Sequence, residues 1–425
     1  MDVELRIERY ADQGRCVAHL DGRVVFVRFA LPGELVRVRL DEPHKRQDRY
    51  CTGEVIEVLE ASPDRREPVW PMAGPLAWGG GLGGADLIHV SLPGQLTWKA
   101  DLIRQQMGRL GGTRLEDVPI ARPDDGTCPD GLHWRTRIDL VADDQGRPSM
   151  RRRGSHERVA LESMPLASRR LLDQADELGL WNGGFKPGSR IRMAMPEPLD
   201  GLGTDGNFAL QIDGRTEKGS DPLTEQIRPN TGRPDEDTFT YRVDAGGFWQ
   251  IHRLAPSLLS GAVLTEARRR VGEQKAPVVW DLYSGAGLFT LPLAAAFGGR
   301  SRVLAVEGAA GAVTRARENL AAADMTNVEV RRGDVGRVLK HGVPKALAHP
   351  DLVLLDPPRA GAKAEVCRLL DQAGPSTIIY VACDPTSLAR DTGTLLSLGY
   401  ELADIHAYDI YPMTHHVETM AVFTR

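Results

Sequence analysis

The sequence has little of what marks secreted or membrane-bound proteins. No apolar segment near its start has the form of a signal peptide, and no long uninterrupted apolar run occurs, which argues against a membrane-spanning helix. The cysteines are odd in number and scattered, and none forms a Cys-x-x-Cys pair, which argues against a disulfide framework. They are Cys16, Cys51, Cys128, Cys367 and Cys383. We therefore expect a soluble, cytoplasmic protein without a membrane partner.

An excess of positive charge is also absent. The 53 Lys and Arg residues against 58 Asp and Glu give a formal net charge of −5. This balance neither indicates nor excludes nucleic-acid binding, because the local field decides it. A metal site is not predicted, since the adjacent His415 and His416 would point to opposite faces of a strand. The length of 425 residues indicates two or three domains.

The most informative stretch is 278–287, with the sequence VVWDLYSGAG. A short apolar run is followed by a turn that contains Gly285 and Gly287, and then by an apolar segment typical of a helix. Strand, glycine turn and helix form the first unit of nucleotide-binding α/β sheets, where glycine lets the backbone approach a ligand. The motif is not the dinucleotide fingerprint, because Thr290 stands at the position of its third glycine. A strand–helix turn that binds no ligand is therefore an alternative.

Acidic residues after the next two strands favour a nucleoside ligand. Glu307 ends the predicted strand that starts at Arg302, at a spacing suited to accept hydrogen bonds from both ribose hydroxyls. Asp334 ends the following strand and would lie beside the adenine. Together these features fit S-adenosylmethionine better than a dinucleotide.

From Phe239 onward, β and α segments alternate in the order typical of a doubly wound, mostly parallel sheet. Ligands of such sheets bind outside the carboxyl ends of the strands. Five polar residues fall at such ends, namely Asp281, Glu307, Asp334, Asp356 and Cys383. This convergence predicts a site at that edge of the sheet.

Residues 1–62 contain five short alternating segments, with Asp21-Gly22 as a hairpin turn. This pattern predicts a small closed β-barrel of the OB kind. Its loops carry Lys45, Arg46 and Arg49. Such barrels often bind nucleic acid, and solvated charge on a structural barrel is the alternative.

Residues 63–240 are the least regular part of the sequence. Proline-rich and glycine-rich segments precede a predicted helix at 92–110, and short strands then alternate with polar turns. The segment 221–237 is polar and interrupted by proline, which predicts a linker or a mobile loop. A basic cluster either faces solvent or binds phosphate, and it consists of Arg151, Arg152 and Arg153.

Two residues in the last part of the chain are candidates for chemistry. Cys383 ends an apolar strand, and Asp384-Pro385 then begins a helix, so the thiol would lie at a helix N-terminus that favours the thiolate. Beside a methyl donor, a thiolate can attack and activate a poorly reactive carbon. Glu418 is the candidate carboxylate. The alternatives are a small core cysteine and a solvated glutamate.

Four motifs resemble those of the RNA uracil-C5 methyltransferases, which act on tRNA or 23S rRNA. They are DLYSGAG at 281–287, LDPPRAG at 355–361, VACDPTSLARD at 381–391 and PMTHHVE at 412–418. Phe248-Trp-Gln250 is a further match, and the N-terminal barrel resembles the TRAM domain of the same family. The resemblance covers both ends of the chain and matches the middle poorly.

The resemblance implies an α/β fold of three parts. A TRAM-like barrel would occupy 1–62 and a mixed α+β central domain 63–240, with the helix at 92–110 packed on the catalytic domain. A doubly wound, Rossmann-like methyltransferase domain would occupy 241–425. Barrel and central domain would both contact RNA, and we expect a monomer without a protein partner.

The resemblance also assigns roles to residues. Cys383 would add to C6 of uracil, C5 would take the methyl group from S-adenosylmethionine, and Glu418 would remove the C5 proton as general base. Asp356 has a second possible role, which is to position the uracil. The target would be an unpaired loop uridine that leaves its stack. The methyl donor would be held by Gln250, Tyr283, Glu307, Asp334 and Asp356.

Three departures from the family pattern are visible. Leu288 replaces an asparagine after the glycine loop, which removes a contact to the methyl donor. Asp384 replaces an asparagine after the cysteine, and its charge would raise the pKa of Cys383. We predict no iron–sulfur cluster, because four apolar residues stand where rRNA-specific relatives carry cysteines, namely Trp70, Leu82, Ala85 and Met164.

Two other functions stay open at this point. One is a methyltransferase for a non-RNA acceptor, which the Cys383 and Glu418 motifs and the barrel speak against. The other is an RNA-binding protein that keeps the fold without turnover, which Leu288 and Asp384 favour. The sequence does not specify whether the RNA is rRNA or tRNA, nor which uridine is methylated.

Overall fold

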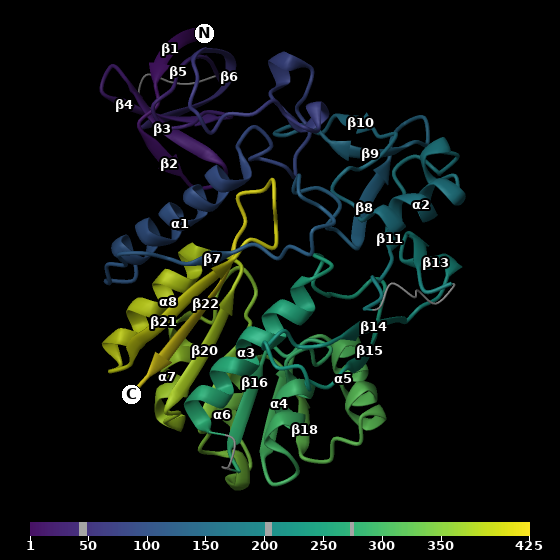
Figure 1. The fold of residues 1–425 in the computed structure, drawn as a ribbon, viewed down its shortest axis with the longest axis vertical. Helices are drawn as coiled ribbons and strands as arrows, with labels where there is room; N and C mark the ends of the chain where they lie inside the picture. The colour runs from purple at the N-terminus through teal and green to yellow at the C-terminus, as the bar shows by residue number, and fades with distance from the viewer. Residues whose placement is uncertain (42–48, 200–205, 273–275) are drawn as a thin grey trace.

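The computed structural model describes residues 1–41, 49–199, 206–272 and 276–425 of the chain. Figure 1 shows three regions in chain order: a small N-terminal barrel, a middle antiparallel sheet, and a large sheet that includes the C-terminus. Within these ranges, no helix combines the length and the apolar character needed to cross a membrane.

Six short strands form the N-terminal barrel, in the order β1-β5-β6-β4-β3-β2. Ile7 and Glu8 join the first two strands and close the barrel, because their N–H groups donate to Glu34 O (2.9 Å) and to Val17 O (2.8 Å). The hairpin turn predicted at residues 21–22 has the two positive φ angles, 49° and 79°, that it requires. Five strands were predicted, and the short β2 was missed. The strands are β1 (Asp2–Arg6), β2 (Arg9–Ala11), β3 (Arg15–Leu20), β4 (Arg23–Arg28), β5 (Leu35–Leu40) and β6 (Tyr50–Glu60).

The middle region is an antiparallel sheet in the order β10-β9-β8-β11-β12-β13. Its inward residues Ile138 and Met193 belong to the same buried core as Val25 and Val38 of the barrel, so the two regions share one hydrophobic core. Its strands are β8 (Arg137–Ala142), β9 (Pro148–Arg151), β10 (Arg158–Ala160), β11 (Arg190–Ala194), β12 (Ala209–Ile212) and β13 (Arg215–Gly219). The helical segments are η1 (Pro71–Ala73), η2 (Leu76–Trp78), α2 (Arg169–Glu177) and η3 (Leu180–Asn182).

The linker predicted at 221–237 is wrong, because it contains a strand. Strand β14 (Leu223–Ile227) pairs antiparallel with β15 (Phe239–Val243), and its alternate residues are buried. Glu225 hid this alternation in the sequence, since a carboxylate at an inward position does not suggest a strand. It is tolerated there because Arg137 forms an ion pair with it at 3.3 Å.

The large sheet has the order β18-β17-β16-β19-β20-β22-β21-β7. Strands β16 to β20 run parallel, and β22 is antiparallel to both of its neighbours. The strands are β7 (Ile120–Ala121), β16 (Val278–Leu282), β17 (Arg302–Glu307), β18 (Val328–Arg332), β19 (Leu352–Leu355), β20 (Thr377–Ala382), β21 (Glu401–Tyr408) and β22 (Glu418–Thr424).

Helices cover both faces of this sheet, as a doubly wound fold requires. One buried core contains residues of α3, α4 and α5, and a second contains residues of α6, α7 and α8. The doubly wound, mostly parallel sheet predicted from the alternating pattern is therefore confirmed. The helices are α3 (Ala255–Val271), α4 (Thr290–Phe297), α5 (Ala310–Ala322), α6 (Val335–His341), η4 (Lys345–Leu347), α7 (Lys363–Ala373) and α8 (Pro385–Ser397).

Helix α1 (Leu92–Arg109) connects the barrel with the large sheet (Figure 1). On one side it packs on α8, with Ile103 in the same buried core as Leu388. On the other side, Trp98 Nε1 donates to Ala11 O of β2 at 3.3 Å. Movement of the barrel against the large sheet would therefore break contacts on both sides of this helix.

Candidate functional site

Four of the five residues predicted from the strand ends meet in one cavity of about 900 Å³, whereas the fifth, Asp281, is buried and does not line it. The cavity lies at the carboxyl ends of the parallel strands, where the chain order reverses between β16 and β19. Open α/β sheets bind ligands at this position. Gly287 belongs to the adjoining glycine loop but is not part of the wall. The wall includes Gln250, Tyr283, Gly285, Glu307, Asp334, Asp356, Cys383 and Glu418.

The glycine loop after β16 presents bare backbone to this cavity. Tyr283 has φ of 66°, which is strained for a residue other than glycine, and its N–H donates to Val306 O at 2.8 Å. Gly285 has φ of 55°, and a Cβ placed there would meet no heavy atom within 4 Å. The loop is anchored from below, where Thr290 Oγ1 donates to Asp281 Oδ2. The space beside Gly285 is therefore room for a ligand.

Two carboxylates on the wall are held in place by backbone N–H groups. Glu307 accepts from Gly285 N–H at 3.0 Å and from Ala309 N–H at 2.6 Å, one on each oxygen. A carboxylate has about four acceptor positions, so Glu307 can still accept from a ligand. Asp334 caps α6 by accepting from Arg337 N–H at 3.0 Å. Both groups are thus oriented before any ligand binds.

Unpaired polar atoms on the wall indicate a polar ligand. Gln250 Oε1 and Ser284 Oγ are buried and have no hydrogen-bond partner in the described parts of the chain. Buried polar atoms are normally satisfied, so these two have acceptor capacity to offer. Arg137 fixes the segment before Gln250 by donating to Asp244 O and Gly247 O, at 3.4 and 3.2 Å. Carboxylates, an amide, a hydroxyl and bare backbone fit the amino, ribose and adenine groups of S-adenosylmethionine.

Cys383 directly follows β20, and Asp384 separates it from the first residue of α8. Burial raises the pKa of the Cys383 thiol to about 12, with Glu418 and Asp356 adding to the effect. The thiolate expected at the helix N-terminus is therefore wrong for the free protein. Asp384 occupies that terminus instead, because Oδ1 accepts from Thr386 N–H at 2.7 Å. As predicted, the charge of Asp384 also raises the pKa of Cys383.

Glu418 begins β22 and is 2% exposed. Burial, together with the nearby Asp356 carboxyl, raises the pKa of Glu418 well above its usual value. Burial likewise raises the pKa of Asp356 to about 7. The Tyr411 hydroxyl donates to Glu418 Oε2 at 3.4 Å, which favours the ionised form. Burial and Asp356 thus make the proton of Glu418 harder to remove than that of an exposed carboxyl group.

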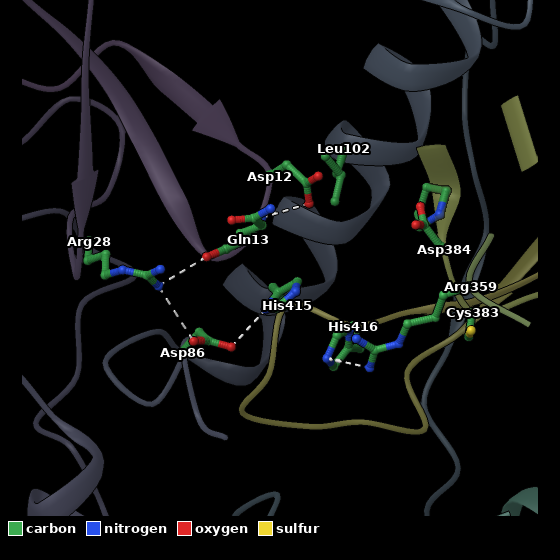
Figure 2. Close-up of a pocket in the computed structure, with 11 residues that line it drawn as sticks. Asp12, Gln13, Arg28, Asp86, Leu102, Arg359, Cys383, Asp384, His415 and His416 are labelled. Carbon is green, nitrogen blue, oxygen red and sulfur yellow. Dashed lines mark hydrogen bonds and ion pairs between the residues drawn. The ribbon is translucent and has the colours of Figure 1, made fainter. Parts of the chain in front are cut away.

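Cys383 also borders a second, smaller cavity of about 350 Å³. Figure 2 shows this cavity between the barrel, α1 and the segment that precedes β22, with barrel residues Asp12, Gln13 and Arg28 on one side. The thiol can therefore be reached both from the large cavity and from the direction of the barrel. The two cavities share Asp86, Arg359, Cys383 and His416.

The segment between β21 and β22, which leads into Glu418, is held by α1. Gln95 Oε1 accepts from Met413 N–H at 2.9 Å. Lys99 is fully buried and forms an ion pair with Asp409. Its ammonium group also donates to Tyr411 O at 3.0 Å. The position of Glu418 therefore depends on a helix far away in the sequence.

The predicted RNA-binding residues are in different situations. Lys45 and Arg46 lie outside the described residues. Arg49 and Arg151 are exposed and available to a polyanion. Arg152 already has partners within the chain. It forms an ion pair with Glu157 across the β9–β10 turn at 2.8 Å and donates to Gly80 O at 2.7 Å.

Arg153 was predicted to contact RNA, but its guanidinium makes its contacts within the protein. Its guanidinium donates to Ala73 O at 3.0 Å and to Gly74 O at 2.8 Å, and it stacks on the Phe29 ring at 4.4 Å. It thereby ties the glycine-rich segment to the barrel. The four apolar residues on which the prediction of no iron–sulfur cluster rests are all buried in the same core, namely Trp70, Leu82, Ala85 and Met164. The absence of a cluster stays a prediction.

Several residues on the wall were missed from the sequence, among them three that carry polar side chains. Arg135, Arg359 and Tyr411 all line the large cavity. Arg359 lies inside the predicted motif 355–361, so its position was a usable signal. Nothing local in the sequence marks Arg135 or Tyr411. Leu288, the departure noted after the glycine loop, also lines the cavity and accepts from the Tyr241 hydroxyl through its backbone carbonyl at 3.0 Å.

Comparison with known protein families gives two matches. The model of the tRNA (uracil-5-)-methyltransferase family matches residues 204–425, and the model of the TRAM domain matches residues 2–58. An uncharacterized RNA methyltransferase of Bifidobacterium longum is 59% identical, over 100% of this chain and 97% of the relative. The 23S rRNA (uracil(1939)-C(5))-methyltransferase of Shewanella amazonensis is 29% identical, over 99% of this chain and 95% of the relative.

Among solved structures, the chain is similar to the tRNA (uracil-54, C5)-methyltransferase of Pyrococcus abyssi in complex with S-adenosyl-L-homocysteine. The TM-score is 0.66 at 20% identity, and the match covers 99% of each chain. At this identity the likeness shows the fold, which confirms the predicted α/β architecture with an N-terminal TRAM barrel. The boundaries at 62 and 240 remain a proposal.

Proposed function

The chain belongs to the tRNA (uracil-5-)-methyltransferase family and is an RNA methyltransferase, and from this premise we propose its substrate and mechanism. The chain transfers a methyl group from S-adenosylmethionine to C5 of an unpaired uridine in 23S rRNA or tRNA. The reaction passes through a covalent bond between Cys383 and C6 of the base. One observation carries the proposal: Cys383 and Glu418 line the same cavity as the residues that fit the methyl donor.

The methyl donor, when bound, supplies an electrophilic methyl group to the large cavity. Glu307 has acceptor positions left for the ribose hydroxyls, and Asp334 lies at the adjoining strand end for the adenine. Gln250 Oε1 and Ser284 Oγ would gain the partners that they lack in the free protein. The chain's part is to fix the donor beside Cys383.

Cys383 makes C5 of the uracil reactive. After its proton leaves to solvent, the thiolate forms a bond to C6, and the electron pair of the C5–C6 double bond moves to the carbonyl oxygen as an enolate. C5 then becomes nucleophilic and takes the methyl group. Glu418 removes the proton that remains on C5, the double bond forms again, and the bond between sulfur and C6 breaks. The thiolate is thereby restored.

The target base has to leave its stack to lie beside both Cys383 and Glu418, which favours an unpaired uridine. Barrel residues form one side of the smaller cavity (Figure 2), and the exposed Arg49 of the barrel is available for the RNA backbone. Two relatives from Shewanella are named as methyltransferases of 23S rRNA, so we propose this RNA for the first test and tRNA for the second.

The proposal is tested with RNA from a strain that lacks the protein. We expect incubation with the protein and labelled S-adenosylmethionine to place 5-methyluridine in a single RNA fragment, mapped by mass spectrometry. Separate 23S rRNA and tRNA fractions identify the RNA class. Label that appears only in a small molecule or a protein would move the proposal to a non-RNA acceptor. Bound methyl donor without any methylated product would indicate an RNA-binding protein without turnover.

Replacing Gln250 by alanine is expected to weaken binding of S-adenosylmethionine about tenfold, equivalent to about 1.4 kcal/mol. The physical reason is that Gln250 lines the cavity and its buried Oε1 accepts no bond from the described chain. Isothermal titration calorimetry without RNA gives the affinity. Gln105→Ala, on α1 away from the cavity, is the matched control and should bind as the wild type does. A Gln250→Ala affinity within twofold of the wild type would remove this residue from the donor site.

A further inference from the structure

Acidic groups outnumber basic groups around Cys383, which disfavours the thiolate that the proposed chemistry needs. Three carboxyl groups raise the pKa of the thiol, those of Glu418, Asp356 and Asp384, in addition to burial. A thiolate formed in this setting would be an additional anion in a half-buried site. The site therefore needs a cation, and Arg359 is the group that lowers the pKa of Cys383.

Arg359 lies in the segment between β19 and α7, and it lines both of the cavities that meet at Cys383. Figure 2 shows its side chain extending from beside Cys383 toward His416. The Arg359 Nη2 atom lies 3.2 Å from His416 Nε2. Among the described residues, no carboxylate lies within ion-pair distance of Arg359. Its positive charge is thus not neutralised by a partner of its own.

His416 can hold Arg359 without cancelling its charge. Burial, then His415 and Arg359, lowers the pKa of His416 to about 3, so the ring is neutral and Nε2 accepts from the guanidinium. The ring is fixed in place, since it lies 4.1 Å from the His415 ring. His415 in turn bonds to Asp86 at 2.7 Å. A neutral, rigid acceptor keeps the guanidinium at the junction of the two cavities with its charge available.

We propose that Arg359 is a positioning residue for the reaction, which supplies the positive charge opposite the Cys383 thiolate, and that His416 holds its guanidinium there. The proposal rests on the role of Cys383 in the proposed function. The competing role for an exposed arginine beside an RNA site is a contact to a phosphate. The two roles differ in one measurable respect, because a phosphate contact does not change the thiol in the absence of RNA.

The test measures the reactivity of the Cys383 thiol in the free protein. Cys16, Cys51 and Cys367 are buried, so Cys128→Ser provides a background in which Cys383 is the accessible thiol. The protein is treated with iodoacetamide at mildly alkaline pH without RNA or methyl donor. The rate of modification of the Cys383 peptide is followed by mass spectrometry. Since the thiolate is the reacting form, the rate reports the ionised fraction.

We expect Arg359→Gln to slow alkylation about threefold to tenfold, because a thiolate without its counter-charge is less populated and only partly compensated by higher nucleophilicity. Arg359→Lys should keep most of the wild-type rate, and His416→Ala should slow alkylation by a smaller factor. The matched control is Arg390→Gln on α8, an exposed arginine of the same part of the fold, which should react as the background does. Thermal melting of each variant shows that it is folded.

Two results would overturn the inference. One is an unchanged alkylation rate in Arg359→Gln. A raised Kd for RNA in the same variant, measured without the methyl donor, would then make Arg359 a phosphate contact. The other is equal slowing in Arg359→Gln and Arg359→Lys, which would point to packing instead of charge. Neither depends on methyl transfer, so an RNA assay that yields no 5-methyluridine would remove the proposed function and leave the thiol measurement intact.

Discussion

Methyl transfer to RNA by a Cys383→Ala variant is expected to fall roughly 10⁴-fold or more. Uracil C5 is a poor nucleophile, and no other thiol borders the large cavity in the described parts of the chain. Without the sulfur, the electron pair needed at C5 is not released, and a bound methyl donor stays unreacted. The measurement is single-turnover formation of labelled 5-methyluridine with the protein in excess over RNA.

Binding of S-adenosylmethionine is the control for this variant. It should change less than threefold, because the side chain is small and is not among the groups proposed to hold the methyl donor. A companion variant, Glu418→Gln, should form the bond between sulfur and C6 but fail to release it, since the C5 proton then has no acceptor. This adduct would appear as a protein–RNA species that resists denaturation. Retention of more than a tenth of the activity by Cys383→Ala would rule out the covalent route.

The convergence of the site was predictable from the sequence because it follows from topology. The carboxyl ends of parallel strands lie on one edge, so residues such as Glu307 and Asp356 had to come together once the β/α alternation was recognised. Glycine turns and strand-end acids are local signals that survive in a single sequence. Their order along the chain then fixes which wall of the cavity each one occupies.

The protonation state of Cys383 was not predictable in the same way. The local pattern, a cysteine before a helix, favours the thiolate. Burial by distant segments and the carboxyls of Glu418 and Asp356 reverse this preference. Arg359 was recognised as part of a motif, but its effect on the thiol depends on the ring of His416. Such effects need the tertiary neighbours, which come from different strands.

Polar residues inside the fold were a second source of error. Glu225 made a strand look like a linker, because its partner Arg137 is remote in the sequence. Arg153 looked like a phosphate-binding residue, yet its guanidinium satisfies backbone carbonyls beneath the glycine-rich segment. Charged residues are usually exposed. Only the folded structure shows which of them are buried with an ion-pair or hydrogen-bond partner. The same applies to Lys99, which sequence reasoning did not single out.

Replacing Asp409 by asparagine is expected to lower the free energy of unfolding by about 3–5 kcal/mol. Asp409 is fully buried and lies between two cations, Lys99 and Arg122, whose Nε donates to it at 2.8 Å. The variant keeps the shape of the side chain but leaves two positive charges facing each other without the anion between them. Urea unfolding followed by tryptophan fluorescence gives the change.

A second substitution separates charge from packing. Lys99→Met combined with Asp409→Asn removes one cation together with the anion, and should recover more than half of the lost stability. Glu365→Gln, at an exposed ion pair with Lys340, is the matched surface control and should change stability little. Because Asp409 begins the segment that leads into Glu418, the single variant should also lower kcat more than it changes binding of the methyl donor. A loss of stability below about 1 kcal/mol in Asp409→Asn would show that the buried charges are solvated or rearranged, and that the ion pair between α1 and Asp409 does not set the position of Glu418.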